Sequence, residues 1–332
     1  MTKVYHDNES SLEPIMNKTI AVIGYGNQGR AQALNLRDSG IRVIVGNPKD
    51  PYAVKASEDG FCVKSIIEAV GGSEVVMVLI PDEIIPEVFK DEIAPHLMEG
   101  ACVVFASGYC AGFGLVKFPD NVDVVMIAPR MIGPGVRDRY VQGLGFPSFV
   151  GVHQDFTGRA KDTMLALAKA LGTLWSGGLE ISMRQEAELD LFSEQGFGPA
   201  FGNLLMNSIQ LLVGEGYPVE AVLMELFMSG ELEYTLNKMT HEGVIEQMDF
   251  HSHTSQYGSM TRARRFAELP LREKLKQSLD EIRSGKFITE WTREQEQGLP
   301  NFKKLKERRL NHPMVNWQNQ TRDAFHFHKV EK

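Results

Sequence analysis

Residues 18–46 read KTIAVIGYGNQGRAQALNLRDSGIRVIVG, and this stretch decides the fold of the first half of the chain. An apolar run at 20–23 leads into a glycine turn, an amphipathic helical pattern follows, and a second apolar run spans 41–45. That order is a βαβ unit, and its turn matches the G-x-G-x-x-G pattern in which backbone N–H groups and a helix N-terminus face a pyrophosphate. We therefore predict a dinucleotide site formed by Gly24, Tyr25, Gly26, Asn27, Gln28 and Gly29.

The rest of the chain divides into two regions with different hydrophobic patterns. Further apolar runs lie at 75–80, 101–106, 122–127 and 148–152, separated by turns and by helix-compatible segments such as 86–98. Strands that alternate with helices predict an open parallel sheet with helices on both faces. After about Trp175 the strand-like runs give way to long helical patterns rich in Leu, Met and Glu. We predict an α/β fold with a Rossmann-type, doubly wound domain at 1–180 and an all-helical domain at 181–332.

Composition excludes several classes of function. The 332 residues carry a net charge of −8, which offers no field to gather nucleic acid or anionic lipid. No run approaches the roughly 18 apolar residues of a membrane span. The three cysteines show no metal spacing, and the polar N-terminus lacks the pattern of a secretory signal. We expect a cytoplasmic protein without nucleic-acid or membrane partners.

The segment after the second strand, GNPKDPY at 46–52, offers a residue of each charge for cofactor choice. Lys49 could reach a 2′-phosphate, whereas Asp50 could hold the ribose hydroxyls. The alternative interpretation is that both are solvated loop residues. This pattern alone leaves NADH and NADPH open.

Three carboxylates recur every four residues in the helical half, at Glu186, Asp190 and Glu194. This spacing places them on one stripe of a helix, where like charges are destabilising unless something neutralises them. Mg²⁺ held by carboxylates would do so; the alternative is a solvated acidic face. Glu225 and Glu231 form a second acidic group, but a six-residue separation does not put them on one face of a regular α-helix.

Six stretches together carry a resemblance to a known family: IGYGNQGRAQALNLRDSG, LIPDEI, DEIAPHL, VGVHQDFTGRAKD, ELDLFSEQ and SHTSQYG. The chain resembles the ketol-acid reductoisomerases (acetohydroxyacid isomeroreductases) of branched-chain amino-acid synthesis, in their short form, almost from end to end. The resemblance implies a Rossmann domain followed by an interlocked helical domain. It also implies NAD(P)H, two Mg²⁺ ions and an active site completed by a second subunit.

Matched position by position, Asp190 and Glu194 fall on the family's metal ligands, and Glu231 is the best match for a ligand of the second metal. Ser252 falls on a substrate-contacting serine, and Pro81 and Asp82 fall beside the nicotinamide ribose. Two positions depart from the family pattern: Ser107 stands where the family has a histidine, and Arg130 where it has a lysine. An arginine keeps the charge but does not give up a proton. The loop at 46–52 also lacks the family's phosphate-binding Arg and Ser, which favours NADH.

These departures led us to favour a reductoisomerase-like, NAD(P)H- and Mg²⁺-dependent oxidoreductase with altered specificity for a 2-hydroxy-3-keto acid or related keto acid. One alternative is the family's own reaction in valine and isoleucine biosynthesis, and another is a nucleotide-binding homologue without catalysis. The apolar, Met-rich helical half predicts a homodimer or higher oligomer with shared active sites. The candidate catalytic residues are Asp190, Glu194, Arg130 and Ser107.

Overall fold

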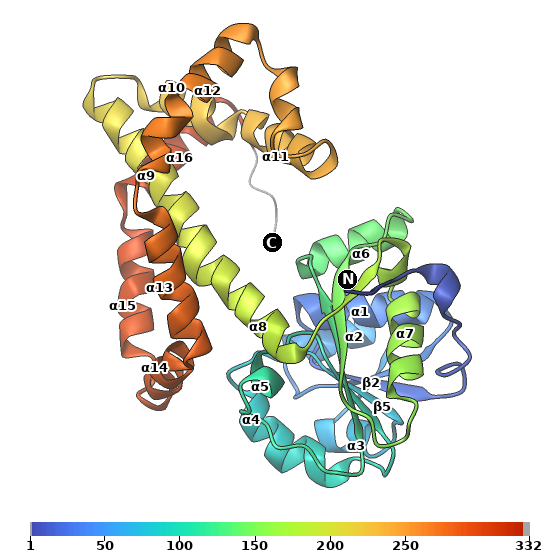
Figure 1. The fold of residues 1–332 in the computed structure, drawn as a ribbon. Helices are drawn as coiled ribbons and strands as arrows, with labels where there is room; N and C mark the ends of the chain where they lie inside the picture. The colour runs from blue at the N-terminus through green and yellow to red at the C-terminus, as the bar shows by residue number, and fades with distance from the viewer. Residues whose placement is uncertain (1, 328–332) are drawn as a thin grey trace. The chain divides into compact units, whose positions relative to one another are not determined.

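A computed structural model describes residues 2–327 of the chain (Figure 1). The fold separates into two compact units, Met1–Asp190 and Leu191–Lys332. The boundary predicted from the sequence, between 180 and 181, lies earlier in the chain, just ahead of the helix that begins at Met183. The two units are described in turn.

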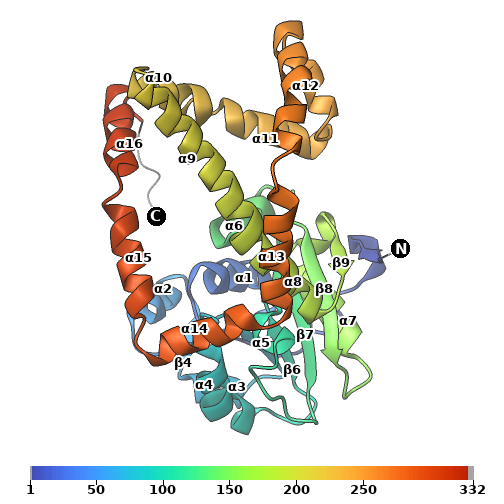
Figure 2. The same cartoon turned by 60° about the vertical axis from the view of Figure 1, so that its left-hand side comes forward.

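The first unit is built on one sheet of nine strands (Figure 2). The strands are β1 Val4–Tyr5, β2 Thr19–Ile23, β3 Arg42–Gly46, β4 Cys62–Lys64, β5 Val75–Val78, β6 Cys102–Phe105, β7 Asp123–Pro129, β8 Ser148–Gln154 and β9 Gly178–Glu180. Six of the nine lie in the spatial order β4-β3-β2-β5-β6-β7, all parallel. This is the strand order of a doubly wound dinucleotide-binding fold, and the order reverses between β2 and β5. The predicted Rossmann-type domain is confirmed.

The prediction of a wholly parallel sheet is wrong at one side. β8 runs antiparallel to β7, β9 pairs with β8, and β1 returns antiparallel to β9. The sequence did not predict β1, β4 and β9. Each has only two or three residues, which is too short to show the alternation of apolar and polar side chains that is typical of a strand. β9 also lies beyond Trp175, where we expected no further strand.

Helices cover both faces of this sheet. The helical segments of the first unit are η1 Asp7–Glu9, α1 Asn27–Asp38, α2 Pro51–Glu58, α3 Ile66–Val70, α4 Ile85–Val88, the π-helix η2 Phe89–Ile93, η3 Ala94–His96, α5 Tyr109–Gly112, α6 Gly133–Val141, α7 Ala160–Ala170 and η4 Thr173–Trp175. α1, α6 and α7 pack together on one face, while α3 and η2 pack together on the other. The central strands between them are apolar and buried, as in β5, where no residue is more than 2% exposed. This buried sheet is a rigid support for the loops at its carboxyl edge.

The second unit is helical throughout its described residues, as predicted. α8 Met183–Phe192 crosses the boundary between the units and continues as the π-helix η5 Ser193–Phe197. The remaining segments are α9 Gly198–Gly214, α10 Val219–Leu223, the π-helix η6 Met224–Met228, α11 Glu231–His241, η7 Glu246–Phe250, α12 His253–Ala267, α13 Leu271–Arg283, α14 Lys286–Glu296, α15 Pro300–Leu310 and α16 Pro313–Ala324.

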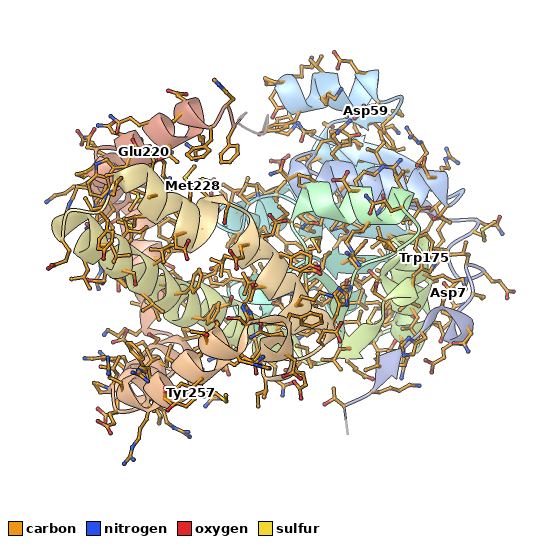
Figure 3. The ribbon with its side chains drawn as sticks, turned by 90° about the horizontal axis from the view of Figure 1, so that it is seen from above. Asp7, Asp59, Trp175, Glu220, Met228 and Tyr257 are labelled. Atoms are coloured by element: carbon orange, nitrogen blue, oxygen red, sulfur yellow. The ribbon has the colours of Figure 1, made fainter. Side chains whose placement is uncertain are left out.

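The core of the second unit is small. Ile209 of α9, Val222 and Leu223 of α10 and Met314 of α16 are buried together. Partly buried side chains surround them, among them Met228 of η6, which is labelled in Figure 3. Much of the apolar surface of this unit therefore stays uncovered within one chain.

Candidate active site

A cleft of about 590 Å³ opens at the carboxyl edge of the parallel strands, where the strand order reverses. Open α/β sheets bind their ligands at this position. Its walls are the glycine turn after β2, the segment after β3, the segment after β5 and the end of β6. The lining residues that sequence analysis named are Gly24, Tyr25, Gly26, Asn27, Gln28, Asp50, Pro81, Asp82 and Ser107.

The three glycines of the turn have different surroundings. A Cβ on Gly24 would lie 2.7 Å from the Leu79 carbonyl oxygen, and Gly24 has a φ of +92° that favours glycine. A Cβ on Gly29 would lie 2.1 Å from the Gly24 carbonyl oxygen, so this glycine lets α1 pack on the turn. No protein atom lies within 4 Å of a Cβ on Gly26. Gly26 is the N-cap of α1 and lines the cleft, so this open space is where a pyrophosphate would approach.

The polar side chains of the turn are engaged with the protein. Tyr25 is buried, and its hydroxyl donates to Asp59 at 3.0 Å. Gln28 Nε2 donates to the Met131 carbonyl oxygen at 3.0 Å. These two bonds fix the turn from both sides, so Tyr25 and Gln28 serve as anchors of its backbone.

The loop after β3 carries Asp50 and Lys49, the two residues that we considered for the choice between NADH and NADPH. Asp50 caps α2, with its Oδ1 accepting from the Ala53 N–H at 2.9 Å and from Asn47 Nδ2 at 2.8 Å, and it lines the cleft. Lys49 does not line the cleft; it lines a separate shallow groove beside α2. Asp50 therefore borders both the cleft and this groove, whereas Lys49 borders the groove alone.

The far end of the cleft is formed by segments after β5 and β6. Pro81 and Asp82 follow β5, and Ser107 follows β6 with its Oγ accepting from the Tyr109 N–H at 3.1 Å. Cys110, on the short helix behind Ser107, directs its Sγ to the Asp82 carbonyl oxygen at 3.6 Å. Cys110 is buried, and burial raises the pKa of its thiol, which favours the uncharged form.

A charged cluster lies directly beside Ser107. Arg130 follows β7 at the same sheet edge and reaches two carboxylates of α8, with Nη2 on Glu186 Oε1 at 2.6 Å and Nη1 on Asp190 Oδ1 at 2.9 Å. The second oxygen of Glu186 accepts the Gly108 N–H at 2.6 Å. The cleft and this cluster are thus joined through the peptide bond between Ser107 and Gly108.

Glu186 is the member of this cluster that sequence analysis did not assign to the site. Its side chain is fully buried, and burial raises the pKa of its carboxyl group while the Gly108 N–H and Arg130 act in the opposite direction. Sequence analysis considered Mg²⁺ or a solvated acidic face for this carboxylate stripe; within the first unit the guanidinium of Arg130 pairs with both Glu186 and Asp190. Arg130 and Glu186 lie 56 positions apart in the chain, so no local pattern could have paired them.

The other predicted site residues belong to the second unit. Glu194 lies in η5, four residues beyond Asp190 along the helical chain. Glu231 is the first residue of α11, and its N–H donates to Ser229 Oγ at 3.3 Å. Ser252 is the N-cap of α12, with its Oγ accepting from the Ser255 N–H at 3.3 Å.

The structure answers one open question about Glu225 and Glu231. A π-helix is present at Met224–Met228, but it ends before Gly230, which has a φ of +87°. Glu225 and Glu231 therefore lie in two different helical segments, and the π-helix does not align them on one face.

Over residues 2–327, no group of three or more His, Cys, Asp or Glu side chains converges in a metal-binding arrangement. The donor chemistry at Asp190 nevertheless fits a hard cation: its Oδ1 meets Arg130, and the carboxylate is 44% exposed. Mg²⁺ is commonly held by one or two carboxylates, with water and substrate as its other ligands. Asp190 is therefore the carboxylate of this cluster whose exposure and donor type suit such an ion.

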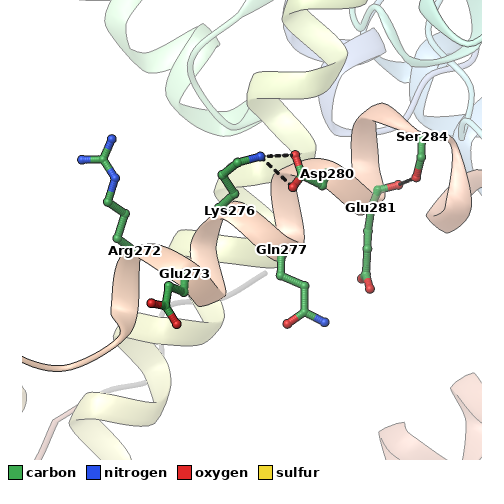
Figure 4. Close-up of a pocket in the computed structure, with 7 residues that line it drawn as sticks. All are labelled: Arg272, Glu273, Lys276, Gln277, Asp280, Glu281 and Ser284. Carbon is green, nitrogen blue, oxygen red and sulfur yellow. Dashed lines mark hydrogen bonds and ion pairs between the residues drawn. The ribbon is translucent and has the colours of Figure 1, made fainter.

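Two other features bear on where a site can be. A hollow of about 670 Å³ runs along α13, but six of its seven lining residues belong to that single helix and the seventh, Ser284, caps it (Figure 4). It contains none of the predicted site residues. In the part of the chain that the structure describes, no helix combines the length and apolar character that crossing a membrane requires.

The fold and cleft define a nicotinamide-dinucleotide-binding oxidoreductase. Two family descriptions match the chain: "Acetohydroxy acid isomeroreductase, NADPH-binding domain" over residues 14–177 and "Ketol-acid reductoisomerase, C-terminal domain" over residues 183–327. The chain belongs to the ketol-acid reductoisomerase family, and it is an NAD(P)H-dependent enzyme.

Individual relatives span nearly the whole chain. A "Ketol-acid reductoisomerase (NADP(+))" of Pyrobaculum neutrophilum is 42% identical over 317 residues, which are 95% of this chain and 96% of that protein. A "Putative ketol-acid reductoisomerase 3" of Saccharolobus solfataricus is 44% identical over 90% of this chain and 91% of that protein. The solved structure of an NADH-preferring ketol-acid reductoisomerase from an uncultured archean superposes with a TM-score of 0.91, at 33% identity, covering 97% of this chain and 98% of that one. These likenesses favour the family's own reaction, which we had held as the alternative, and they give no support to an altered specificity.

Proposed function

We propose that this chain catalyses the ketol-acid reductoisomerase reaction of branched-chain amino-acid biosynthesis. In this reaction an alkyl group of a 2-hydroxy-2-alkyl-3-oxo acid migrates to the neighbouring carbon, and NAD(P)H reduces the resulting 2-oxo group to give a 2,3-dihydroxy acid. The observation that carries the proposal is the junction of the dinucleotide cleft with the Arg130–Glu186–Asp190 cluster at one sheet edge. The end-to-end likeness to family members supports it.

The chain's own residues would divide the work. The glycine turn holds the pyrophosphate on the α1 N-terminus, and Pro81, Asp82 and Ser107 form the end of the cleft where the nicotinamide would lie. Arg130 supplies a permanent positive charge beside this end. Bound Mg²⁺ would polarise the ketone and hydroxyl oxygens, and the nicotinamide would supply hydride.

We propose Asp190 and Glu194 as magnesium ligands and Glu231 as a ligand of a second ion. Asp190 has the exposure and donor type that this role requires. Ser252, as the N-cap of α12, has a hydroxyl oxygen at a helix N-terminus, which is compatible with contact to an anionic substrate. Ser107 cannot replace an imidazole in proton transfer, so we assign to it a hydrogen bond and not acid–base chemistry.

We propose NADH as the preferred reductant. A 2′-phosphate in this cleft would face Asp50, while Lys49 lies in the neighbouring groove. A carboxylate repels a phosphate and hydrogen-bonds a ribose diol. The structural relative described as NADH-preferring is consistent with this choice.

We propose further that the chain works as a homodimer or higher oligomer in which a second copy covers the apolar surface of the helical unit and completes the active site. Phe197, Leu204 and Leu211 follow one face of η5 and α9 and are each at least 60% exposed. Large exposed apolar side chains that recur on one helix face often mark a protein–protein contact. A partner would also supply the ligands that one chain lacks.

The test is a reductase assay with purified protein, 2-acetolactate and either NADH or NADPH, with and without Mg²⁺. We expect Mg²⁺-dependent cofactor oxidation that is faster with NADH, and a 2,3-dihydroxy acid as product. Oxidation only with a keto acid that lacks the 2-hydroxyl group would contradict the proposal. So would a rate that does not depend on Mg²⁺.

A further inference from the structure

The side chain of Glu186 does more than pair with a neighbour, because both of its oxygens are committed. Oε2 accepts the Gly108 N–H and Oε1 accepts Nη2 of Arg130, each at 2.6 Å, in a fully buried position. The backbone of Gly108 packs closely against this side chain. A Cβ on Gly108 would lie 2.0 Å from the Met183 carbonyl oxygen and 2.9 Å from Glu186 Oε2. The turn after β6 therefore rests directly on the first turn of α8.

Arg130 is held in one orientation by acceptors around its guanidinium. Nε points to the Ala128 carbonyl oxygen at 3.3 Å, and the guanidinium lies 4.8 Å from the ring centroid of Phe149. Its two terminal nitrogens then meet different carboxylates, Glu186 and Asp190. One positive charge is shared between two negative ones, and only the Asp190 side of the pair is open to solvent.

A shared guanidinium affects how strongly Asp190 can bind anything else. A cation that coordinates Asp190 competes with Nη1 of Arg130 for the same carboxylate, and it is repelled by the guanidinium charge. Glu186 neutralises part of the guanidinium charge. This weakens both the competition of Arg130 for Asp190 and the repulsion between Arg130 and the cation. A planar fork can serve two carboxylates at once, which a single ammonium group cannot do in the same way.

We infer that Glu186 is a positioning residue that sets the divalent-cation affinity of Asp190 by holding Arg130 away from full engagement with that carboxylate. The inference rests on the proposed function in taking Asp190 as a cation ligand. It assigns to the buried carboxylate a role that acts through Arg130, without contact to substrate, cofactor or metal.

The test measures Mn²⁺ binding to the full-length protein by electron paramagnetic resonance, without nucleotide or substrate. We expect Glu186→Gln to weaken Mn²⁺ binding about tenfold, because Arg130 then pairs with Asp190 alone. Adding Arg130→Met to this variant should restore wild-type affinity or better, since Asp190 is then released. A purely structural role for Glu186 predicts the opposite order, with the double variant at least as impaired as the single one.

Glu188→Gln is the matched control. It removes the same charge from the same helix, where Glu188 pairs with Arg184 at 2.8 Å. Its Mn²⁺ affinity should stay within about twofold of wild type, since it leaves Arg130 shared. An effect as large as that of Glu186→Gln would reduce the inference to a general charge effect and overturn it.

Arg130→Lys covers the case in which Glu186→Gln does not fold. The single ammonium should remain with the fully buried Glu186, where water does not compete, so Mn²⁺ should bind several-fold more tightly. Unchanged or weaker binding would overturn the inference, as would wild-type affinity in a folded Glu186→Gln protein. Asp190→Asn distinguishes failure of the Glu186 inference from failure of the proposed function. If this variant binds Mn²⁺ like wild type, Asp190 is not a metal ligand and the proposed metal assignment fails.

Discussion

The two units of this chain hide their apolar side chains to different degrees. In the first unit the central strands β5 and β6 are buried, and even the large side chains of Tyr25, Phe89 and Phe105 are no more than 2% exposed. In the second unit Phe197, Leu204 and Leu211 are at least 60% exposed although they follow one helix face. The central strands of the dinucleotide unit thus lie in a core formed by one chain, whereas the helical unit leaves large apolar side chains exposed on one helix face, and this exposure is the basis of the proposed assembly.

The largest expected effect comes from charging the exposed stripe of the helical unit. A double variant, Leu204→Glu with Leu211→Glu, should convert an oligomer into monomers and abolish turnover, because two carboxylates cannot be buried in an apolar interface. NADH binding should survive, since the cleft lies wholly in the first unit. Sedimentation velocity, NADH fluorescence and the reductase assay measure the three quantities.

Val54→Glu is the control for that experiment. Val54 is 60% exposed on α2 and belongs to no such stripe, so its replacement should leave the oligomer intact. A wild-type protein that sediments as a monomer near 37.1 kDa would contradict the proposed assembly. Loss of NADH binding in the double variant would contradict the independence of the two units.

Within the first unit, two glycines of the same turn should fail in different ways. Gly26→Val should weaken NADH binding by on the order of 100-fold or more with the fold intact, because its side chain enters the space left for the pyrophosphate. Gly29→Ala should lower the thermal midpoint instead, since its Cβ meets a backbone oxygen at 2.1 Å. Circular dichroism melting and NADH fluorescence separate the outcomes. Full NADH binding by a folded Gly26→Val protein would show that the cleft assignment is wrong.

Cofactor choice should respond to Asp50 and not to Lys49. Asp50→Asn keeps an N-cap for α2 but removes the charge that faces the cleft, so the ratio of NADPH to NADH affinity should rise about tenfold. Lys49→Ala should leave this ratio unchanged, because Lys49 lines the outer groove. Equilibrium titration with both nucleotides measures the ratio. A loss of NADPH affinity on replacing Lys49 would reverse the proposed preference.

The smallest expected effect is on acid stability. Hydrogen bonding from Arg30 holds the pKa of Asp59 below its ordinary value, with the Tyr25 hydroxyl adding to the effect (Asp59 is labelled in Figure 3). A lowered pKa in the folded state contributes stability above the unfolded pKa, near 3.8, and this is lost as pH falls through the folded value. Asp59→Asn should therefore lose under about 1 kcal/mol at neutral pH and nothing in strong acid.

Urea unfolding at both pH values measures this difference. Asp280→Asn is the comparison from the second unit, where Asp280 pairs with Lys276 on the open face of α13 (Figure 4). Both members of that pair are more than half exposed, so the change should be smaller than for Asp59. If the free energy of unfolding depends on pH equally in wild type and Asp59→Asn, Asp59 does not contribute to acid stability.

The sequence predicted features that depend on residues close together in the chain. It did not predict contacts between residues far apart in the chain. The turn of Gly24, Gly26 and Gly29 and the strand before it follow from spacing alone, because the period of a βαβ unit is contained in 29 residues. The short strands β1 and β9 carry no such period. The spacing of Glu186 and Asp190 predicted that they share one helix face, but their pairing with Arg130 depends on the register of β7 against β6 and on the packing of α8.

We propose that this chain performs metal-dependent ketol-acid reductoisomerisation through Asp190. The most direct test compares 2-acetolactate turnover by wild type and Asp190→Asn with NADH and Mg²⁺, together with NADH binding by both. We predict Mg²⁺-dependent turnover by the wild type and a loss on the order of 10³-fold in the variant, with NADH binding retained, because polarisation of the substrate oxygens contributes several kcal/mol. Wild-type protein that leaves 2-acetolactate unchanged, or an Asp190→Asn variant as active as wild type, would contradict the claim.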